Sequence, residues 1–446
     1  MDIVVMIAQF VLSLSILIIL HEMGHFIPAR LFKTRVEKFY LFFDPWFSLV
    51  KKKIGDTEYG IGWLPLGGYV KISGMVDESF DKEQMKQPPQ PWEFRSKPAW
   101  QRLIIMLGGV TVNFILGFFI FGMLLWAYGE AYLPTENAKY GIMVDSLGRE
   151  MGLQNGDKIL KIGEQEFDRF NDRTLIRGIA LDNARSITVE RQGSVVEVPI
   201  DEKYVGELTA SRNKNVSLFN TRLPFVAGKI ADGSPAEKAD FKAEDQLLAV
   251  NGENLEFFDQ FQAKVKSMPS QEITVTLVRN KTDTLSKQVT TSEQGTIGIF
   301  PMGPDYFFEM ERQDYTLAQA LPAGVTKGWN FLADQIKAFG QMFKGNIKAT
   351  ESLGGFASIT SLFPTTWDWE TFWRITAILS LILGFMNLLP IPALDGGHVV
   401  FLLWEVVTGK KVSDKVMETA TMIGFFLLIG LLLFANGLDV FRFFNK

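Results

Sequence analysis

The sequence predicts a polytopic α-helical membrane protein in which two β-rich domains are inserted between the second and third of four transmembrane helices. Three observations support this fold class. Four apolar runs approach or exceed the roughly 20 residues that a helix needs to cross a bilayer. A sequence pattern repeats within the long segment between the second and third runs. A stretch rich in glycine and aromatic residues, between the first two runs, predicts a β-hairpin that dips into the membrane interface.

The composition excludes several classes of protein. Charged residues make up 21% of the chain and the mean hydropathy is +0.11, which is apolar for a soluble protein. The net charge of -5 gives no electrostatic footprint for nucleic acid. Because the chain has no cysteine, it has no disulfide framework, and any metal must be held by imidazole and carboxylate groups.

The four apolar runs define the predicted membrane spans. The first run lacks the basic flank and the small-residue cleavage site of a signal peptide, so we expect it to be a retained helix. The runs are Ile3–Leu20, Leu103–Tyr128, Ile375–Leu394 and Thr419–Leu438. With their flanks, they predict transmembrane helices over residues 1–30, 102–128, 371–395 and 419–438.

Basic residues predict the orientation of the spans. Lysines and arginines follow the first helix between Arg30 and Lys53, and three lysines lie between the last two spans. Positive-inside reasoning therefore places both loops in the cytoplasm, and the termini and residues 129–374 on the other side. This places His21 and Asp395 at a similar depth, toward the cytoplasmic side.

Residues 31–101 are expected to form a cytoplasmic and membrane-re-entrant β segment. The hairpin is predicted within Tyr59–Gly74, where two short apolar runs surround a Leu-Gly-Gly sequence. Its strand at Gly67, Gly68, Tyr69, Val70 and Lys71 offers an edge that can pair with an extended substrate.

The segment between the second and third spans contains an internal repeat. Asn155–Gly163 matches Ala243–Asn251, and Ile187–Arg191 matches Val275–Arg279 at the same offset of 88 residues. Two copies predict tandem β-rich domains, over residues 131–205 and 220–303.

Residues 314–350 follow the second repeat. Their apolar residues recur every three or four positions, which predicts an amphipathic helix on the outer interface or against the spans. A core helix of the external domain is the alternative.

The first span ends in a metal-binding motif. His21 and His25 lie four residues apart, so a helix places both imidazoles on one face, where they can bind one metal ion. Glu22, beside the pair, can act as general base and later as general acid toward an attacking water. Ionisable groups at membrane depth are costly and usually functional, which favours a metal site over isolated polar contacts.

A second motif follows the third span. Asp395 interrupts apolar sequence and is the candidate third ligand, although it could instead cap a helix that starts at Gly396. His398 is either a further ligand or a polar contact outside the metal shell. Two prolines before Asp395 break the helix, which is tolerated at membrane depth only inside protein or beside a watery cavity. Asn387 either positions a substrate or satisfies backbone groups that the prolines leave free.

These motifs together resemble the site-2 protease family of intramembrane zinc metalloproteases. The resemblance rests on the His-Glu-x-x-His motif, on Gly109–Gly117 in the second span and on the block from Asn387 to His398. It implies a Zn²⁺ ion held by His21, His25 and Asp395, and a catalytic Glu22.

The resemblance also implies roles for other segments. Asn387 would position the substrate, and the hairpin would be a membrane re-entrant strand. The run Gly233–Ala239 is similar to PDZ domains of bacterial envelope proteases, so both repeats are expected to be PDZ-like and to filter substrates or bind trimmed ends. Asn113 belongs to the Gly109–Gly117 motif of the second span, but the residues give it no role, and packing through Gly109 and Gly117 is a sufficient explanation for this motif.

The sequence therefore predicts a bacterial inner-membrane zinc endopeptidase that cleaves single-span membrane proteins, such as anti-sigma factors or remnant signal peptides. A membrane-anchored PDZ scaffold with a structural metal site is the main alternative, and a metal transporter is another. Glu22 argues against a scaffold, because a structural metal site needs no base.

Overall fold

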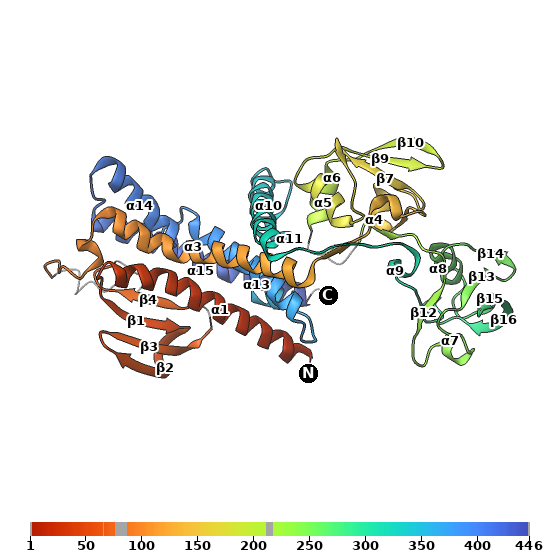
Figure 1. Ribbon diagram of the computed structural model, residues 1–446, viewed down its shortest axis with the longest axis horizontal. Helices are drawn as coiled ribbons and strands as arrows, with labels where there is room; N and C mark the ends of the chain where they lie inside the picture. Colours follow the sequence, from red (N-terminus) through yellow and green to blue (C-terminus); the bar gives the residue numbers. More distant parts are fainter. Residues whose placement is uncertain (1, 66, 76–86, 211–216, 445–446) are drawn as a thin grey trace. The chain divides into compact units, whose positions relative to one another are not determined.

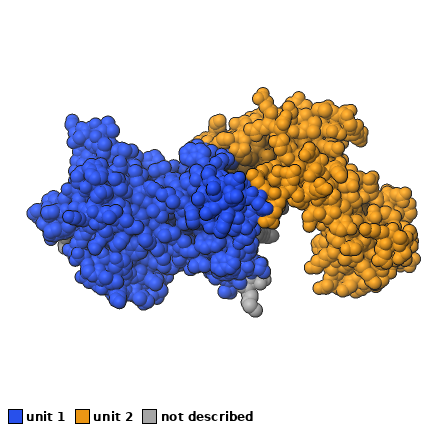
Figure 2. All heavy atoms as spheres, in the orientation of Figure 1, with its two compact units in different colours: residues 1–129, 314–336, 353–446 blue, residues 130–313, 337–352 orange. Residues whose placement is uncertain are grey.

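The computed structural model describes residues 2–65, 67–75, 87–210 and 217–444. The chain forms two compact units, shown in blue and orange in Figure 2. We call the first the helical unit; it comprises Met1–Gly129, Asp314–Ile336 and Leu353–Lys446. We call the second the β-rich unit; it comprises Glu130–Gln313 and Lys337–Ser352.

Among the described residues of the helical unit, four helices are long and apolar enough to cross a membrane, as the sequence predicts; Figure 1 labels each of them. They are α1 (Asp2–Leu31), α3 (Ala99–Tyr128), α13 (Trp369–Leu388) and α15 (Asp414–Phe444). The unit also contains the short helices η1 (Phe94–Ser96) and α12 (Phe356–Thr360).

The predicted end of the third span, at residue 395, is wrong. α13 stops at Leu388, and a separate helix that the sequence analysis missed, α14, runs from Asp395 to Thr408. Pro390 and Pro392 explain the break, because each lacks a backbone N–H and disfavours helical geometry in the residue before it. Gly409 follows α14 as its C-cap, and its φ of 67° is one that glycine adopts without strain.

Glycines bring α1, α3 and α13 close together. A Cβ atom at Gly24 of α1 would lie 2.4 Å from the carbonyl oxygen of Gly108 in α3. A Cβ atom at Gly117 of α3 would lie 2.6 Å from the Leu381 side chain of α13. Small residues at helix crossings allow this close packing of spans. The hydroxyl of Ser380 adds a hydrogen bond of 2.7 Å to the carbonyl oxygen of Asn113.

The segment after α1 forms a four-stranded sheet with the order β2-β3-β1-β4. Its strands are β1 (Val36–Leu41), β2 (Phe43–Ile54), β3 (Thr57–Leu64) and β4 (Tyr69–Ile72).

The predicted hairpin within Tyr59–Gly74 is therefore wrong. β3 and β4 do not pair with each other, because β1 lies between them, parallel to β3 and antiparallel to β4. Val36 and Tyr40 of β1 are fully buried, as expected for a central strand. The parallel strands β1 and β3 cannot be joined by a tight turn. Their pairing therefore cannot be predicted from strands that follow one another directly in the sequence. Leu66, between them, lies outside the described residues.

The β-rich unit contains two modules with the same sheet topology. The first sheet has the order β10-β9-β7-β8 and the second β16-β15-β13-β14. The strands of the first are β7 (Lys158–Ile162), β8 (Gln165–Glu166), β9 (Ser186–Arg191) and β10 (Ser194–Pro199). Those of the second are β13 (Gln246–Val250), β14 (Glu253–Asn254), β15 (Glu272–Arg279) and β16 (Asp283–Thr290).

The same ion pair recurs in both modules. Arg191 contacts Asp157 at 2.7 Å, and Arg279 contacts Asp245 at 2.7 Å. Both partners are displaced by the repeat length of 88 residues, so the sequence repeat corresponds to a structural one. The core of the first module extends beyond the predicted boundary at residue 205, because Leu218 and Phe219 are buried in it.

Shorter elements complete the β-rich unit. Those around the first sheet are β5 (Glu130–Tyr132), η2 (Thr135–Asn137), β6 (Ile142–Val144), α4 (Ser146–Glu150), α5 (Asp172–Ala180), α6 (Lys203–Thr209) and β11 (Phe219–Thr221). Those that follow are β12 (Ala227–Ile230), α7 (Pro235–Lys238), α8 (Phe258–Lys266), β17 (Ile299–Pro301), α9 (Pro304–Phe307), β18 (Glu311–Gln313) and α11 (Ala349–Ser352).

Within the predicted amphipathic segment 314–350, α10 spans Leu317–Phe343. Leu332 packs into a buried cluster with Phe121 of α3 and Leu381 of α13. Trp329 and Ile336 remain exposed. One side of α10 thus packs against the spans.

Candidate metal centre and family

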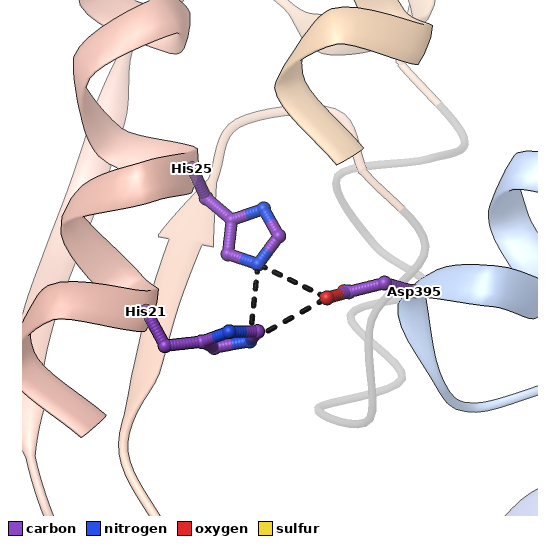
Figure 3. A group of neighbouring side chains, drawn as sticks. All are labelled: His21, His25 and Asp395. Atoms are coloured by element: carbon purple, nitrogen blue, oxygen red, sulfur yellow. Dashed lines mark hydrogen bonds and ion pairs between the residues drawn. The ribbon is translucent and has the colours of Figure 1, made fainter. Parts of the chain in front are cut away.

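Three side chains converge inside the helical unit (Figure 3). His21 and His25 project from one face of α1, and Asp395 faces them from the first residue of α14. The two imidazole Nε2 atoms lie 3.3 Å apart. The Oδ2 atom of Asp395 lies 3.4 Å from Nε2 of His21 and 3.3 Å from Nε2 of His25.

This donor set fits a zinc ion. Tetrahedral zinc with bonds of about 2.0–2.1 Å requires ligand atoms about 3.3–3.4 Å apart, which matches all three separations. Oδ2 of Asp395 is buried and has no hydrogen-bond partner among the described residues, an arrangement that is costly unless a cation binds it. Two imidazoles and one carboxylate also leave the fourth position open, as catalytic zinc sites require.

Contacts behind the histidines fix their orientation. Nδ1 of His25 lies 2.8 Å from the carbonyl oxygen of Ile105 in α3. A carbonyl accepts only, so His25 carries its proton on Nδ1, and Nε2 is free to bind a metal. The sequence could not predict this contact, because every residue has a backbone carbonyl and nothing marks the one at Ile105.

Asn113 is a site residue to which the sequence analysis could assign no role. It is fully buried in α3, and its side-chain amide lies 3.0 Å from Nδ1 of His21. When His21 binds a metal through Nε2, its N–H at Nδ1 needs an acceptor. The Asn113 side-chain oxygen, which has no partner within the described part of the chain, supplies one after the amide rotates. One feature of the sequence could have indicated a role for Asn113: it is the single amide side chain in the apolar run Leu103–Tyr128.

Gly109 makes room for the two imidazoles. A Cβ atom at this position would lie 2.3 Å from Nε2 of His25 and 2.6 Å from Cε1 of His21. The expectation that helix packing explains Gly109 is therefore incomplete, whereas it does account for Gly117. The glycine belongs to the wall of the metal centre.

The other predicted site residues lie around this cluster. Glu22 is half-buried on α1, and its Cγ atom would be 3.6 Å from a Cβ atom at Gly68, just before β4. The amide Nδ2 of Asn387, in the last turn of α13, lies 3.4 Å from Nε2 of His21. The structure thus brings these two side chains to the same site from different elements.

Asp395 and His398 have different surroundings. The N-cap of α14 is Leu394 and makes no side-chain hydrogen bond, so the Asp395 carboxylate faces the histidines and does not cap a helix beginning at Gly396. His398 is not in the metal cluster; it lines a pocket with Arg102 and Glu405.

A family model described as "Peptidase family M50" matches residues 9–431. The chain belongs to this peptidase family. The match confirms the resemblance to site-2 proteases. With the zinc-fitting cluster, it identifies the chain as a zinc metalloendopeptidase whose four apolar helices fit intramembrane proteolysis.

Three relatives align with this M50 peptidase over almost its whole length. A protein from Neisseria meningitidis, whose name describes a zinc metalloprotease, is 28% identical over 97% of this chain and 98% of its own. The regulator of sigma-E protease RseP of Escherichia coli is 28% identical over 98% of both chains. The regulator of sigma E protease of Haemophilus influenzae is 26% identical over 97% of this chain and 98% of its own.

The predicted substrate strand lies at an edge of the M50 peptidase's small sheet. Gly67 and Gly68 precede β4, whereas Tyr69, Val70 and Lys71 lie in it. β4 pairs with β1 on one side, and no described strand pairs with its other side. A hydrogen bond holds Tyr69 in place in β4, because its hydroxyl donates to Asp44 at 2.8 Å. Burial raises the pKa of this phenol, so it stays protonated as a donor.

Proposed function

We propose that this M50 peptidase hydrolyses peptide bonds within the transmembrane segments of single-span membrane proteins. The observation that carries the proposal is the cluster of His21, His25 and Asp395, which lies among helices apolar enough to span a bilayer. Ionisable groups within a bilayer are costly, so a metal site among spanning helices indicates that the substrate is also in the membrane.

The three clustered residues would hold the zinc ion, and Glu22 would be the general base. A bound zinc ion supplies Lewis-acid activation of water and of the scissile carbonyl. Glu22 follows His21 directly on α1, so its carboxylate can take a proton from the attacking water and deliver it to the leaving amine.

The free edge of β4 would bind the substrate as an added strand. A helical substrate hides its amides in its own hydrogen bonds and must become extended before attack. An edge strand offers backbone partners for such a segment. Gly68 lies against Ile18 and Glu22, so a strand added beside β4 would pass close to the proposed base. Asn387, whose amide lies 3.4 Å from Nε2 of His21, would hydrogen-bond the substrate backbone.

The remaining assignments follow the charge pattern and the relatives. The Lys-rich loops would lie in the cytoplasm, which places the metal centre toward that side and the β-rich unit outside. Its two modules would be PDZ-like domains that bind trimmed substrate ends. Because two relatives are named regulators of sigma-E, we propose an anti-sigma factor as the substrate class, with remnant signal peptides as a second class.

The test compares purified Glu22→Gln protein with wild type. We expect full zinc content by elemental analysis, but no cleavage of a single-span reporter in liposomes. Glu136→Gln is the matched control, because it removes an exposed carboxylate in η2 of the β-rich unit. Cleavage by Glu22→Gln at the wild-type rate would contradict the mechanism. Zinc-free wild type that cleaves would favour the scaffold alternative, with a contaminating protease as the source of activity.

A further inference from the structure

An open pocket of about 520 Å³ lies where α1 ends and the sheet begins. We propose that this pocket binds the phosphate group of an anionic phospholipid. Its lining combines three cations, one carboxylate, one hydroxyl and one indole: Arg30, Lys33, Arg35, Asp56, Thr34 and Trp92.

The three cations are available to a ligand. None of them forms an ion pair with any residue that the structure describes, and Asp56 offsets only one of their charges. Two arginines elsewhere in the helical unit do form ion pairs, Arg95 with Glu93 and Arg102 with Glu405. Arginine guanidinium groups bind phosphate through paired hydrogen bonds, so the pocket has the chemistry of an anion site.

Helix stability does not account for this cluster. Arg30 lies in the last turn of α1, where a cation interacts favourably with the helix dipole. Lys33 and Arg35 come after the helix has ended, so this effect does not explain them.

The backbone around the pocket is held in place before any ligand binds. The N–H of Thr34 donates to Ala29 at 2.8 Å, and the N–H of Arg35 donates to Trp92 at 2.9 Å. Lys97 brings a fourth cation close to the pocket, because its ammonium group donates to the carbonyl oxygen of Lys33 at 3.3 Å. Thr34 is 1% exposed, and no residue that the structure describes forms a hydrogen bond with its hydroxyl, so the wall of the pocket includes an unsatisfied polar group.

Position along α1 favours a lipid headgroup over a soluble phosphate. α1 is a candidate span, and its apolar surface continues to Leu31, which is 73% exposed. Trp92 and Trp100 are about half exposed beside it, as aromatic residues at a membrane surface commonly are. The pocket therefore lies where the phosphate groups of the adjoining leaflet are concentrated, and basic sites at this depth bind anionic lipids.

The test is a lipid titration of delipidated, full-length protein in neutral detergent, followed by native mass spectrometry. The probes are phosphatidylglycerol and phosphatidylcholine with identical acyl chains. We expect phosphatidylglycerol to bind more tightly, and the R30Q/K33Q/R35Q variant to lose its affinity on the order of 100-fold, or about 5-fold per cation. The matched control is K51Q/K52Q/K53Q, which removes three exposed lysines from β2 of the same unit and should lose less than about 3-fold.

Three outcomes would overturn the proposal: equal losses in the two triple variants, unchanged phosphatidylglycerol binding in the pocket variant, or equal binding of phosphatidylcholine. Inorganic phosphate that displaces the lipid at an equal concentration would assign the pocket to a soluble anion. If the pocket variant does not fold, R35Q alone removes one exposed cation and should lose about 5-fold. A loss for R35Q no greater than for K52Q would likewise exclude the site.

Discussion

Replacing Gly109 by alanine tests the close approach of α3 to the metal centre. The new Cβ atom would lie 2.3 Å from Nε2 of His25, whereas ordinary contacts are about 3.5 Å. The imidazoles or the helix must therefore move by about 1 Å. Metal ligands tolerate errors of only about 0.2 Å, so we expect a loss of zinc affinity of about 100-fold.

The assay is competition for zinc with a chelator of known affinity, followed by cleavage of a single-span reporter. Gly117→Ala is the control, because its Cβ atom would meet the Leu381 side chain at 2.6 Å and the carbonyl oxygen of Ala377 at 3.2 Å, and neither residue belongs to the metal cluster. Overpacking there should cost about 1–3 kcal/mol of stability and leave zinc affinity unchanged. Wild-type zinc affinity in the Gly109→Ala protein would refute the reasoning.

Three further substitutions probe individual contacts. Asn113→Ala should weaken zinc binding about 10–100-fold in the same chelator assay, because a metal-binding histidine loses its hydrogen-bond partner; unchanged affinity would contradict that role. Arg102→Gln should destabilise the protein by about 3–5 kcal/mol in thermal unfolding, because it leaves the largely buried carboxylate of Glu405 unpaired. The double variant Arg102→Gln with Glu405→Gln should recover much of this lost stability. Arg279→Gln should destabilise the second module by a similar amount, because Asp245 is fully buried; hydrogen exchange confined to that module would report it, and wild-type protection would argue against it.

Short-range patterns predicted much of the site. The spacing of His21 and His25 places both on one helix face whatever the rest of the chain does. Asp395 could be found because a carboxylate in apolar sequence needs a partner. The same logic applies to Asn113, the single amide in its apolar run, but the sequence does not show which group it contacts.

Long-range pairing was harder to predict. The hairpin prediction joined the neighbouring strands β3 and β4, whereas the structure inserts β1 between them. The alternation of residues within a strand does not encode its partner, especially in a parallel pair. The prolines at 390 and 392 signalled a break, yet a new helix from Asp395 was not foreseen.

The sequence by itself determined the four apolar spans, the repeat and the pairing of His21 with His25 on one helix face, and it offered Asp395 as the candidate third ligand, because hydrophobicity, helical spacing and ligand chemistry are local properties. Only the tertiary structure decided that α3 supplies the carbonyl of Ile105, the amide of Asn113 and the space at Gly109. It also decided that β4 is an edge strand beside Glu22. These features depend on how elements distant in sequence pack, and that packing reflects the summed free energy of many contacts that no single motif records.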